Sequence, residues 1–303
     1  MPISPKTRRR RLLLPLGAAL LAALLPGPAG HPRAAETATV AIVAAENMYG
    51  DVAAQIGGDA VRVTSILSNP DQDPHLFEAS PSVARALAAA RIAVYSGIDY
   101  DPWMAKLLAA TRGTDRITLA VATLGGHHDG DNPHVWYDQA TMLAYARALA
   151  AAFATADPAH ADAYRRRLAA FEASMAPIAA RIAALRAEYH GAAVTATEPV
   201  YGYMFAALGL QVRNMPFQLA VMNNTEPSAR DVAAFEDDLR QHRVRLLLYN
   251  SQATDPIATR MMHIAEAAHV PVVGATETEP AGMTYQRWML DGLDRVERAL
   301  RSR

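Results

Sequence analysis

The chain has 303 residues, enough for two domains or one large one, and 51% of them are hydrophobic, enough for a sizeable core. Its 29 Lys and Arg residues nearly balance 30 Asp and Glu residues, so no basic surface indicates a nucleic-acid partner. The absence of cysteine excludes disulfides, a thiolate metal site and a lipid-modified cysteine anchor.

The first 35 residues have the three-part pattern of a secretory signal peptide. A basic run, Arg8 to Arg11, precedes an almost wholly apolar stretch from Leu12 to Leu25, and small or turn-forming residues follow up to Ala35. The apolar stretch is shorter than the roughly 20 residues that span a bilayer, which favours a signal peptide over a membrane anchor. We expect cleavage near Ala35 and a soluble periplasmic protein. An Arg-Arg-x-Leu-Leu string leaves open whether export uses the twin-arginine route.

Strands and helices alternate in both halves of the mature chain. In the first half, strands are predicted at 40–44, 61–67 and 91–96, and helices at 48–56, 81–90 and 139–154. In the second half, strands are predicted at 192–197, 245–250 and 270–276, and helices at 228–240, 255–269 and 283–300. This alternation predicts an α/β fold with a parallel sheet and right-handed crossovers in each half.

Residues 158–190 have a different pattern, with apolar residues spaced by four and three in turn along one helical face. A single helix here would be about 45 Å long, and Pro177 should kink it or loosen one turn. Such a helix could join two lobes as a strut; two helices broken at Pro177 inside one domain are the alternative. We predict a signal peptide at 1–35, an N-terminal α/β lobe at 36–156, a linker helix at 157–190 and a C-terminal α/β lobe at 191–303.

Four side chains that can bind metal come just after predicted strands: His75, His134, Glu198 and Glu277. In open parallel sheets, ligands bind beyond the carboxyl ends of the strands. Each half supplies two of the four, so the cleft between the lobes could gather them. Neutral imidazoles and carboxylates suit manganese, zinc or ferrous iron, and two carboxylates would neutralise a divalent cation.

Each residue also has a simpler explanation. A loop histidine after a proline is commonly solvated or locally hydrogen-bonded. Glu198 could cap a helix that begins at Pro199, where negative charge is favourable. Glu279 is an alternative to Glu277 as the metal ligand, and either residue could be a surface acid. The shared placement and the division into two pairs are what favour the metal site.

Four stretches in order resemble the periplasmic receptors of zinc and manganese ABC importers, the group whose two lobes are joined by a rigid helix. They are NPDQDPH at 69–75, NPHVWYD at 132–138, ATEPVYGY at 196–203 and GATETE at 274–279. The resemblance covers nearly all of the mature chain. It implies His75, His134 and Glu198 as the first three ligands. The fourth family position, usually aspartate before serine, falls on Glu277 before Thr278, with Glu279 left open.

The resemblance also bears on the metal. Zinc receptors of the family usually have histidine at the third position and manganese receptors glutamate, so Glu198 favours manganese or a tolerant site. Intrinsic affinity at nitrogen–oxygen sites nevertheless favours zinc. Zinc receptors tend to carry a long histidine-rich loop before the second ligand. Only His127 and His128 stand there, in a solvated turn or a shortened metal-gathering loop.

The predicted function is capture of one zinc or manganese ion as cargo by a monomeric receptor. The receptor would deliver the ion directly to an ABC permease that works with an ATPase subunit. We expect a small lobe rearrangement and no catalysis, because four protein ligands would close the site to a catalytic water. Two alternatives stay open: a metal-dependent periplasmic hydrolase, and a receptor for an organic solute or metal chelate. An organic pocket could be lined by aromatic residues, namely Trp136, Tyr137, Tyr201, Tyr203 and Trp288.

Overall fold

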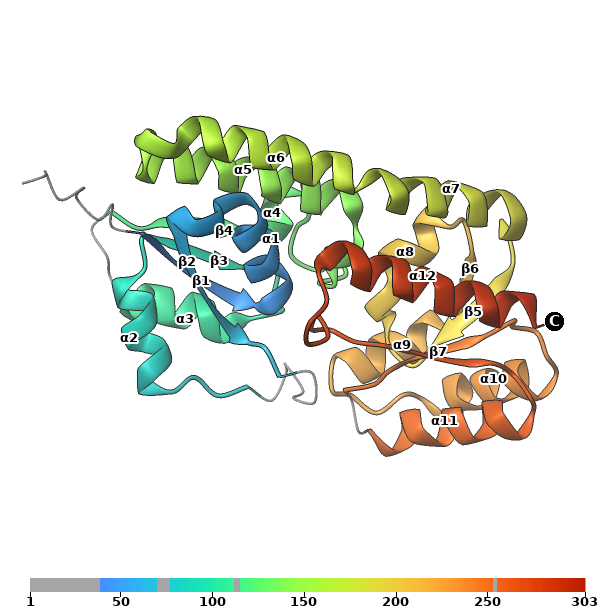
Figure 1. The fold of residues 1–303 in the computed structure, drawn as a ribbon. Coiled ribbons are helices and arrows are strands. Elements are labelled where there is room, and N and C mark those ends of the chain that lie inside the picture. The colour runs from blue at the N-terminus through green and yellow to red at the C-terminus, as the bar shows by residue number, and fades with distance from the viewer. Residues whose placement is uncertain (1–38, 70–76, 112–114, 253–254, 303) are drawn as a thin grey trace, which may run out of the picture. The chain divides into compact units, whose positions relative to one another are not determined.

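A computed structural model describes residues 39–69, 77–111, 115–252 and 255–302. The predicted signal peptide and His75 lie outside these ranges. From Ala38 onward the chain forms one compact unit. This unit contains two four-stranded sheets, both entirely parallel, with helices packed around them (Figure 1).

The N-terminal lobe contains the first sheet, with strand order β2-β1-β3-β4. Its strands are β1 (Val40–Glu46), β2 (Val61–Leu67), β3 (Ile92–Tyr95) and β4 (Ile117–Ala120). Its helices are α1 (Asn47–Gly57), α2 (Pro81–Ala89), α3 (Pro102–Ala110), α4 (Val121–Leu124) and α5 (Gln139–Ala156). The last residues of β1 and β2, Glu46 and Leu67, are paired, so the carboxyl ends of these strands share one edge of the sheet.

The C-terminal lobe contains the second sheet, with strand order β6-β5-β7-β8. Its strands are β5 (Ala193–Ala196), β6 (Gln211–Arg213), β7 (Leu247–Asn250) and β8 (Val272–Ala275). Its helices are α8 (Gly202–Ala207), α9 (Met215–Met222), α10 (Ala229–Arg240), α11 (Pro256–Ala267) and α12 (Tyr285–Arg301). The last residues of β7 and β8, Asn250 and Ala275, are also paired. The two lobes therefore use the same topology, and the predicted fold class is confirmed.

The linker is a helix with one interruption. It consists of α6 (Ala161–Ser174) and α7 (Ala176–Tyr189), which lie end to end with a turn at Met175 between them (Figure 1). Pro177 lacks an N–H and crowds the carbonyl four residues earlier, so a regular helix cannot pass through it. Tighter bonds form instead: Met175 N donates to Glu172 O at 3.2 Å, and Ile178 N donates to Met175 O at 3.1 Å. The turn lies where the sequence predicts a loosened one.

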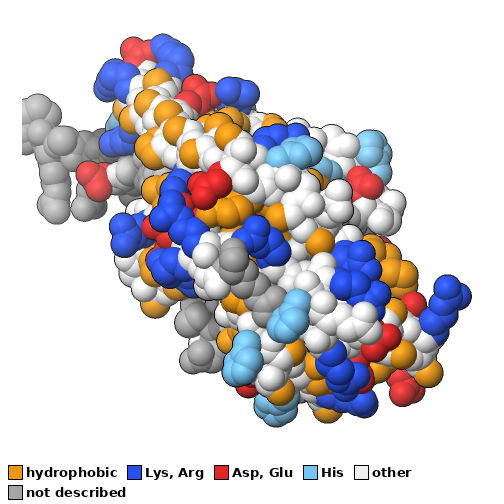
Figure 2. Space-filling model, turned by 90° about the vertical axis from the view of Figure 1, so that its right-hand side faces the viewer, with side chains coloured by type: hydrophobic (Ala, Val, Ile, Leu, Met, Phe, Trp, Pro, Cys, Tyr) orange, Lys and Arg blue, Asp and Glu red, His pale blue; other side chains and the backbone are white. Residues whose placement is uncertain are grey.

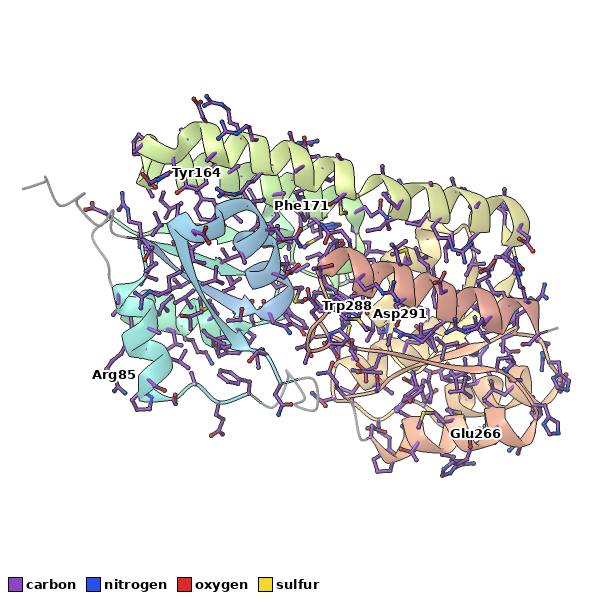
Figure 3. All side chains as sticks on the ribbon, in the orientation of Figure 1. Arg85, Tyr164, Phe171, Glu266, Trp288 and Asp291 are labelled. Carbon is purple, nitrogen blue, oxygen red and sulfur yellow. The ribbon has the colours of Figure 1, made fainter. Side chains whose placement is uncertain are left out.

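The apolar face of the linker is buried in the core of the protein. Helix α6 packs against α1 and α5, and α7 packs against α12. Tyr164 and Phe171 point from α6 towards the N-terminal lobe, and Trp288 lies near the start of α12 (Figure 3). By length and composition alone, Pro158–Tyr189 could cross a membrane. Its periodic apolar residues are instead part of one hydrophobic cluster that extends through both lobes.

Hydrogen bonds also join the two lobes directly. Tyr137 OH donates to Thr276 O at 2.7 Å, and Tyr285 OH donates to Trp136 O at 2.8 Å. Four of the five aromatic residues that could have lined an organic pocket are buried and contribute to this interface: Trp136, Tyr137, Tyr201 and Trp288. They pack as core between the sheets, which removes the main support for an organic-solute pocket.

Candidate metal centre

The candidate site lies where strands of the second sheet end, next to a loop of the N-terminal lobe. Glu198 comes two residues after β5, Glu277 two residues after β8, and Asn250 is the last residue of β7. His134 comes from the N-terminal lobe, in the loop just before the short helix Val135–Tyr137. All four side chains are buried. The parallel topology of the second sheet accounts for the position of Glu198, Asn250 and Glu277, as the strand-end argument predicts. For His134 the prediction of a preceding strand is wrong, because β4 ends at Ala120 and a helix and a loop follow it.

His134 is fully buried and held by Asn132. Both the backbone N and the ring Nδ1 of His134 lie within hydrogen-bonding distance of Asn132 Oδ1, at 3.1 and 2.6 Å. The other ring nitrogen, Nε2, has no hydrogen-bond partner among the described residues. It lies 3.5 Å from Oε2 of Glu277.

This separation suits a metal ion. Zinc–nitrogen bonds of about 2.0–2.1 Å and zinc–oxygen bonds of about 2.0–2.2 Å place two tetrahedral ligands about 3.3 to 3.5 Å apart. When Nδ1 carries the single hydrogen of a neutral imidazole, Nε2 presents a lone pair towards the carboxylate. A buried lone pair facing a buried carboxylate is unfavourable unless a cation lies between them.

The side chain of Asn250 donates to both carboxylates of the C-terminal lobe, and the side chain of Gln252 accepts from the backbone of Glu277. Asn250 Nδ2 donates to Glu277 Oε1 at 2.5 Å and to Glu198 Oε2 at 3.4 Å. Its Oδ1 accepts from Gln252 N at 3.0 Å, while Glu277 N donates to Gln252 Oε1 at 2.5 Å. Asn250 therefore sets the spacing of the two acids.

The predicted ligands are thus brought together only in part. His134 and Glu277 face each other, and Glu198 is linked to Glu277 through Asn250. Within the described ranges, no group of three or more His, Asp or Glu side chains has the spacing of a metal site. The fourth predicted ligand, His75, lies outside those ranges.

Glu279 has a different environment from Glu277. Its backbone N donates to Asn47 Oδ1 at 2.9 Å, and its backbone O accepts from Asn47 Nδ2 at 2.7 Å. Burial, and then the negative charge of Asp51, raises the pKa of the Glu279 carboxyl to about 9. The geometry therefore favours Glu277 over Glu279 beside His134.

Beside the site lies a pair of acidic residues that no sequence motif singles out. Glu46, the last residue of β1, and Asp101 are both buried. Burial, and then the charge of Asp101, raises the pKa of Glu46 well above its usual value. Burial raises the pKa of Asp101 to about 6, although its carboxylate accepts from Ser96 N and Gly97 N at 2.7 and 2.9 Å. The strand-end rule that selected Glu198 would also have selected Glu46.

Tyr100 connects this acidic pair to His134. Its ring packs edge-on against the His134 ring, with centroids 6.0 Å apart. Burial, and then the charges of Glu277 and Glu46, raises the pKa of the Tyr100 hydroxyl well above its usual value. Tyr100 also lines a cavity of about 680 Å³, to which Trp103 and Lys106 contribute from α3 and Leu219 contributes from α9. Tyr100 therefore contacts both the His134 ring and this cavity.

The two histidines that precede His134 in the sequence, His127 and His128, have different surroundings. His127 is partly buried: its Nε2 lies 2.9 Å from Thr141 Oγ1, and its ring packs against Tyr203 of the C-terminal lobe with centroids 5.0 Å apart. His128 is exposed, and its backbone N donates to Asp131 Oδ2 in a turn.

On the face drawn in Figure 2, basic and acidic side chains are interspersed, in keeping with the small net charge.

Two similar parallel-sheet lobes, with a buried imidazole of one lobe facing buried carboxylates at the strand ends of the other, define a two-lobed binding protein. A family model described as "Zinc-uptake complex component A periplasmic", ZnuA, matches residues 42–299, and the chain belongs to this family. The assignment to receptors of metal ABC importers is thus confirmed, and so is the receptor function in metal uptake at the level of the family.

Individual relatives are similar over most of their length. The chain is 24% identical to a "Putative metal-binding protein" of Treponema pallidum (strain Nichols), covering 88% of this chain and 89% of the relative. It is also 24% identical to "Manganese-binding lipoprotein MntA" of Bacillus subtilis (strain 168), covering 77% and 78%. The solved periplasmic zinc binding protein TroA from Treponema pallidum shares the fold, with a TM-score of 0.73, 19% identity, and coverage of 86% of this chain and 99% of that one.

Proposed function

We propose that this chain is a periplasmic receptor that binds one zinc or manganese ion as cargo between its lobes and delivers it to an ABC permease. The observation that carries the proposal is the pair formed by His134 Nε2 and Glu277 Oε2, 3.5 Å apart and fully buried. The proposed ligands are His75, His134, Glu198 and Glu277. Export by a signal peptide at 1–35 would leave lobes at 36–156 and 191–303, joined by the linker at 157–190.

The transport partners follow from the family. A receptor of this class contacts the permease directly, and an ATPase subunit drives the permease. We propose that the chain works as a monomer and performs no catalysis. Metal-dependent turnover of generic ester or phosphate substrates would contradict the proposal that the chain performs no catalysis. Immunodetection in a periplasmic fraction, with the mature N-terminus read by mass spectrometry, tests the export and the cleavage near Ala35.

The choice between zinc and manganese depends on Glu198. A carboxylate in this place suits manganese, whereas the intrinsic affinity order favours zinc at a site made of nitrogen and oxygen. The relatives bear differing names, among them a manganese-binding lipoprotein of Bacillus subtilis and an iron-binding protein of Yersinia pestis. Elemental analysis of the protein purified from its native periplasm without added metal identifies the cargo directly.

The ligand assignment is tested by competition with a chromophoric chelator for Zn²⁺ and Mn²⁺. His134→Ala and Glu277→Gln should each greatly weaken binding of both ions, because each removes one ligand of a closed site. Glu279→Gln is the matched control: it removes a buried carboxylate two residues away and should leave affinity nearly unchanged. Wild-type affinity in both His134→Ala and Glu277→Gln would refute the site. A loss in Glu279→Gln alone would move the fourth ligand to Glu279.

A further inference from the structure

Asn132 makes contacts on every side of its amide group. Its Oδ1 lies 3.1 Å from His134 N and 2.6 Å from His134 Nδ1. Its Nδ2 lies 2.7 Å from the backbone O of Pro199, the residue after Glu198. Its own backbone O accepts from Tyr203 OH at 2.7 Å. One partly buried side chain thus connects a proposed ligand of the N-terminal lobe to the loop that carries a proposed ligand of the C-terminal lobe.

The partners of Asn132 determine the orientation of its amide. A backbone N–H can only donate, so the atom facing His134 N is the oxygen; a backbone carbonyl can only accept, so the atom facing Pro199 O is the NH₂ group. Since that oxygen also faces His134 Nδ1, Nδ1 must carry the hydrogen. In the neutral imidazole, Nε2 is then left with its lone pair, directed at Glu277.

In the C-terminal lobe, the residue closest to the Asn132 side chain at the start of α8 is a glycine, Gly202, which leaves room for it. A Cβ atom at Gly202 would lie 2.7 Å from Asn132 Nδ2, closer than packing allows. The backbone of Gly202 is helical, with φ −57° and ψ −46°, so no backbone strain requires glycine there. Alanine would otherwise be favoured at a helical position by about 1 kcal/mol. The contact with Asn132 is therefore a reason for glycine at the first position of α8.

We propose that Asn132 is a positioning residue for metal capture. It fixes His134 in the tautomer that presents Nε2 to the ion, and it holds this imidazole in register with the loop bearing Glu198 across the cleft. The inference rests on the proposed function, because it takes His134 as a ligand. It adds that the ligand geometry of the two lobes is linked by one amide before any metal arrives.

The test measures Zn²⁺ affinity by chelator competition and the His134 tautomer by ¹⁵N imidazole spectra of the metal-free protein. The His134 signals are assigned by their loss in His134→Ala. Asn132→Ala should weaken Zn²⁺ binding about 10- to 100-fold, the usual effect of losing a partner of a ligating histidine. It should also convert the Nδ1–H signal into one averaged over both tautomers. Thr155→Ala, which removes an exposed hydroxyl of α5 bonded to Ala151 O, is the control and should change neither measurement.

Two further variants separate the two roles of Asn132. Asn132→Asp keeps an oxygen for the Nδ1–H of His134 but loses the donor to Pro199 O. It should restore the tautomer signal while leaving Zn²⁺ affinity between that of the wild type and that of Asn132→Ala. Gly202→Ala alters no polar group, yet by displacing Asn132 it should also weaken binding. Because both changes are small, they carry the test even if Asn132→Ala does not fold.

The inference is overturned if Zn²⁺ affinity in both Asn132→Asp and Gly202→Ala stays within twofold of the wild type, or if Asn132→Ala folds and leaves the tautomer signal of His134 unchanged. That outcome differs from failure of the proposed function. If His134→Ala keeps wild-type affinity, His134 is not a ligand and the proposed site is wrong. If His134→Ala loses binding while the Asn132 variants do not, only the positioning role fails.

Discussion

Replacing Asn250 by aspartate would place a third carboxylate where an amide now holds two. Since Gln252 N must donate to Asn250 Oδ1, the NH₂ group faces Glu277 at 2.5 Å and Glu198 at 3.4 Å. In Asn250→Asp an oxygen takes the place of this NH₂ group. At 3.4 Å and an effective dielectric constant of about 20, two unit charges repel by about 5 kcal/mol. The introduced carboxyl should therefore stay protonated in the metal-free folded protein.

Keeping this proton has a cost that depends on pH. An aspartate ordinarily ionises near pH 3.9, and each pH unit above that value adds about 1.36 kcal/mol. Relative to the wild type, we expect Asn250→Asp to lose about 5 kcal/mol of unfolding free energy at pH 8 and about 1.5 kcal/mol at pH 5. The sign follows from linkage: the folded state would bind one more proton than the unfolded state, so stability falls as pH rises.

Urea unfolding of metal-free protein at pH 5, 6.5 and 8 measures this loss. Asn250→Leu is the control, because it removes the same hydrogen bonds without adding a charge, and its loss should change little with pH. Zn²⁺ should stabilise Asn250→Asp more than Asn250→Leu, since a cation offsets the added charge. If the difference between the two variants is the same at pH 5 and pH 8, the carboxylates of Glu198 and Glu277 are not where the site requires them.

Three further predictions concern the surroundings of the site. Glu198→His should shift preference towards zinc, so the ratio of Mn²⁺ to Zn²⁺ dissociation constants should rise in chelator competition; an unchanged ratio would remove Glu198 from the ligands. Because burial raises the pKa of Asp101 from 3.8 to about 6, this residue should lower the stability of the metal-free protein by about 3 kcal/mol as pH rises from about 4 to 6. Asp101→Asn should reduce the pH dependence in urea titrations by that amount, while the raised pKa values of Glu46 and Glu279 maintain the rest; an unchanged slope would show that Asp101 does not contribute. Asp99 is exposed with φ 63°, so Asp99→Val should lower stability by roughly 1–2 kcal/mol in thermal unfolding, whereas Asp99→Gly should not.

Much of the fold can be predicted from local patterns. Helices are predicted from about 139, 228 and 255, and Asp138, Ser228 and Asp255 there each accept a backbone N–H of the following helix, as Asp and Ser commonly do at helix N-termini. Ser80 precedes a helix that begins at Pro81 as predicted, but its hydroxyl bonds to Ser82 Oγ instead of capping the backbone. The strands β4 and β6 are absent from the prediction. Each is an edge strand of three or four residues, and pairing with a strand distant in sequence fixes it more than its own composition does.

The site is harder to predict because its contacts cross long stretches of sequence. Strand-end placement identifies Glu277, and the family resemblance identifies His134, but 143 residues separate them, and only the packing of the two lobes brings their atoms within 3.5 Å. Glu46 satisfies the same strand-end rule as Glu198, but its closeness to Asp101 depends on how β1 and the loop after β3 lie in the folded sheet. Asn132, Asn250 and Gln252 carry no charge and no spacing typical of a metal site. Their importance becomes visible only through the atoms that they contact.

Asn132 of the N-terminal lobe and Asn250 of the C-terminal lobe orient the proposed ligands in the same way. In Asn132 and Asn250, a backbone N–H fixes the side-chain oxygen, and the remaining amide nitrogen is directed to an acceptor near a proposed ligand. One amide sets a tautomer, and the other sets the distance between two carboxylates. Backbone hydrogen bonds hold both amides in place. The free energy of folding therefore offsets the unfavourable approach of the His134 lone pair and the negative charges of Glu198 and Glu277. An arriving cation then needs little rearrangement, and the energy stored in this unfavourable arrangement adds to its affinity. A linker buried along its apolar face and direct hydrogen bonds between the lobes would preserve such an arrangement, whereas a wide hinge motion would destroy it.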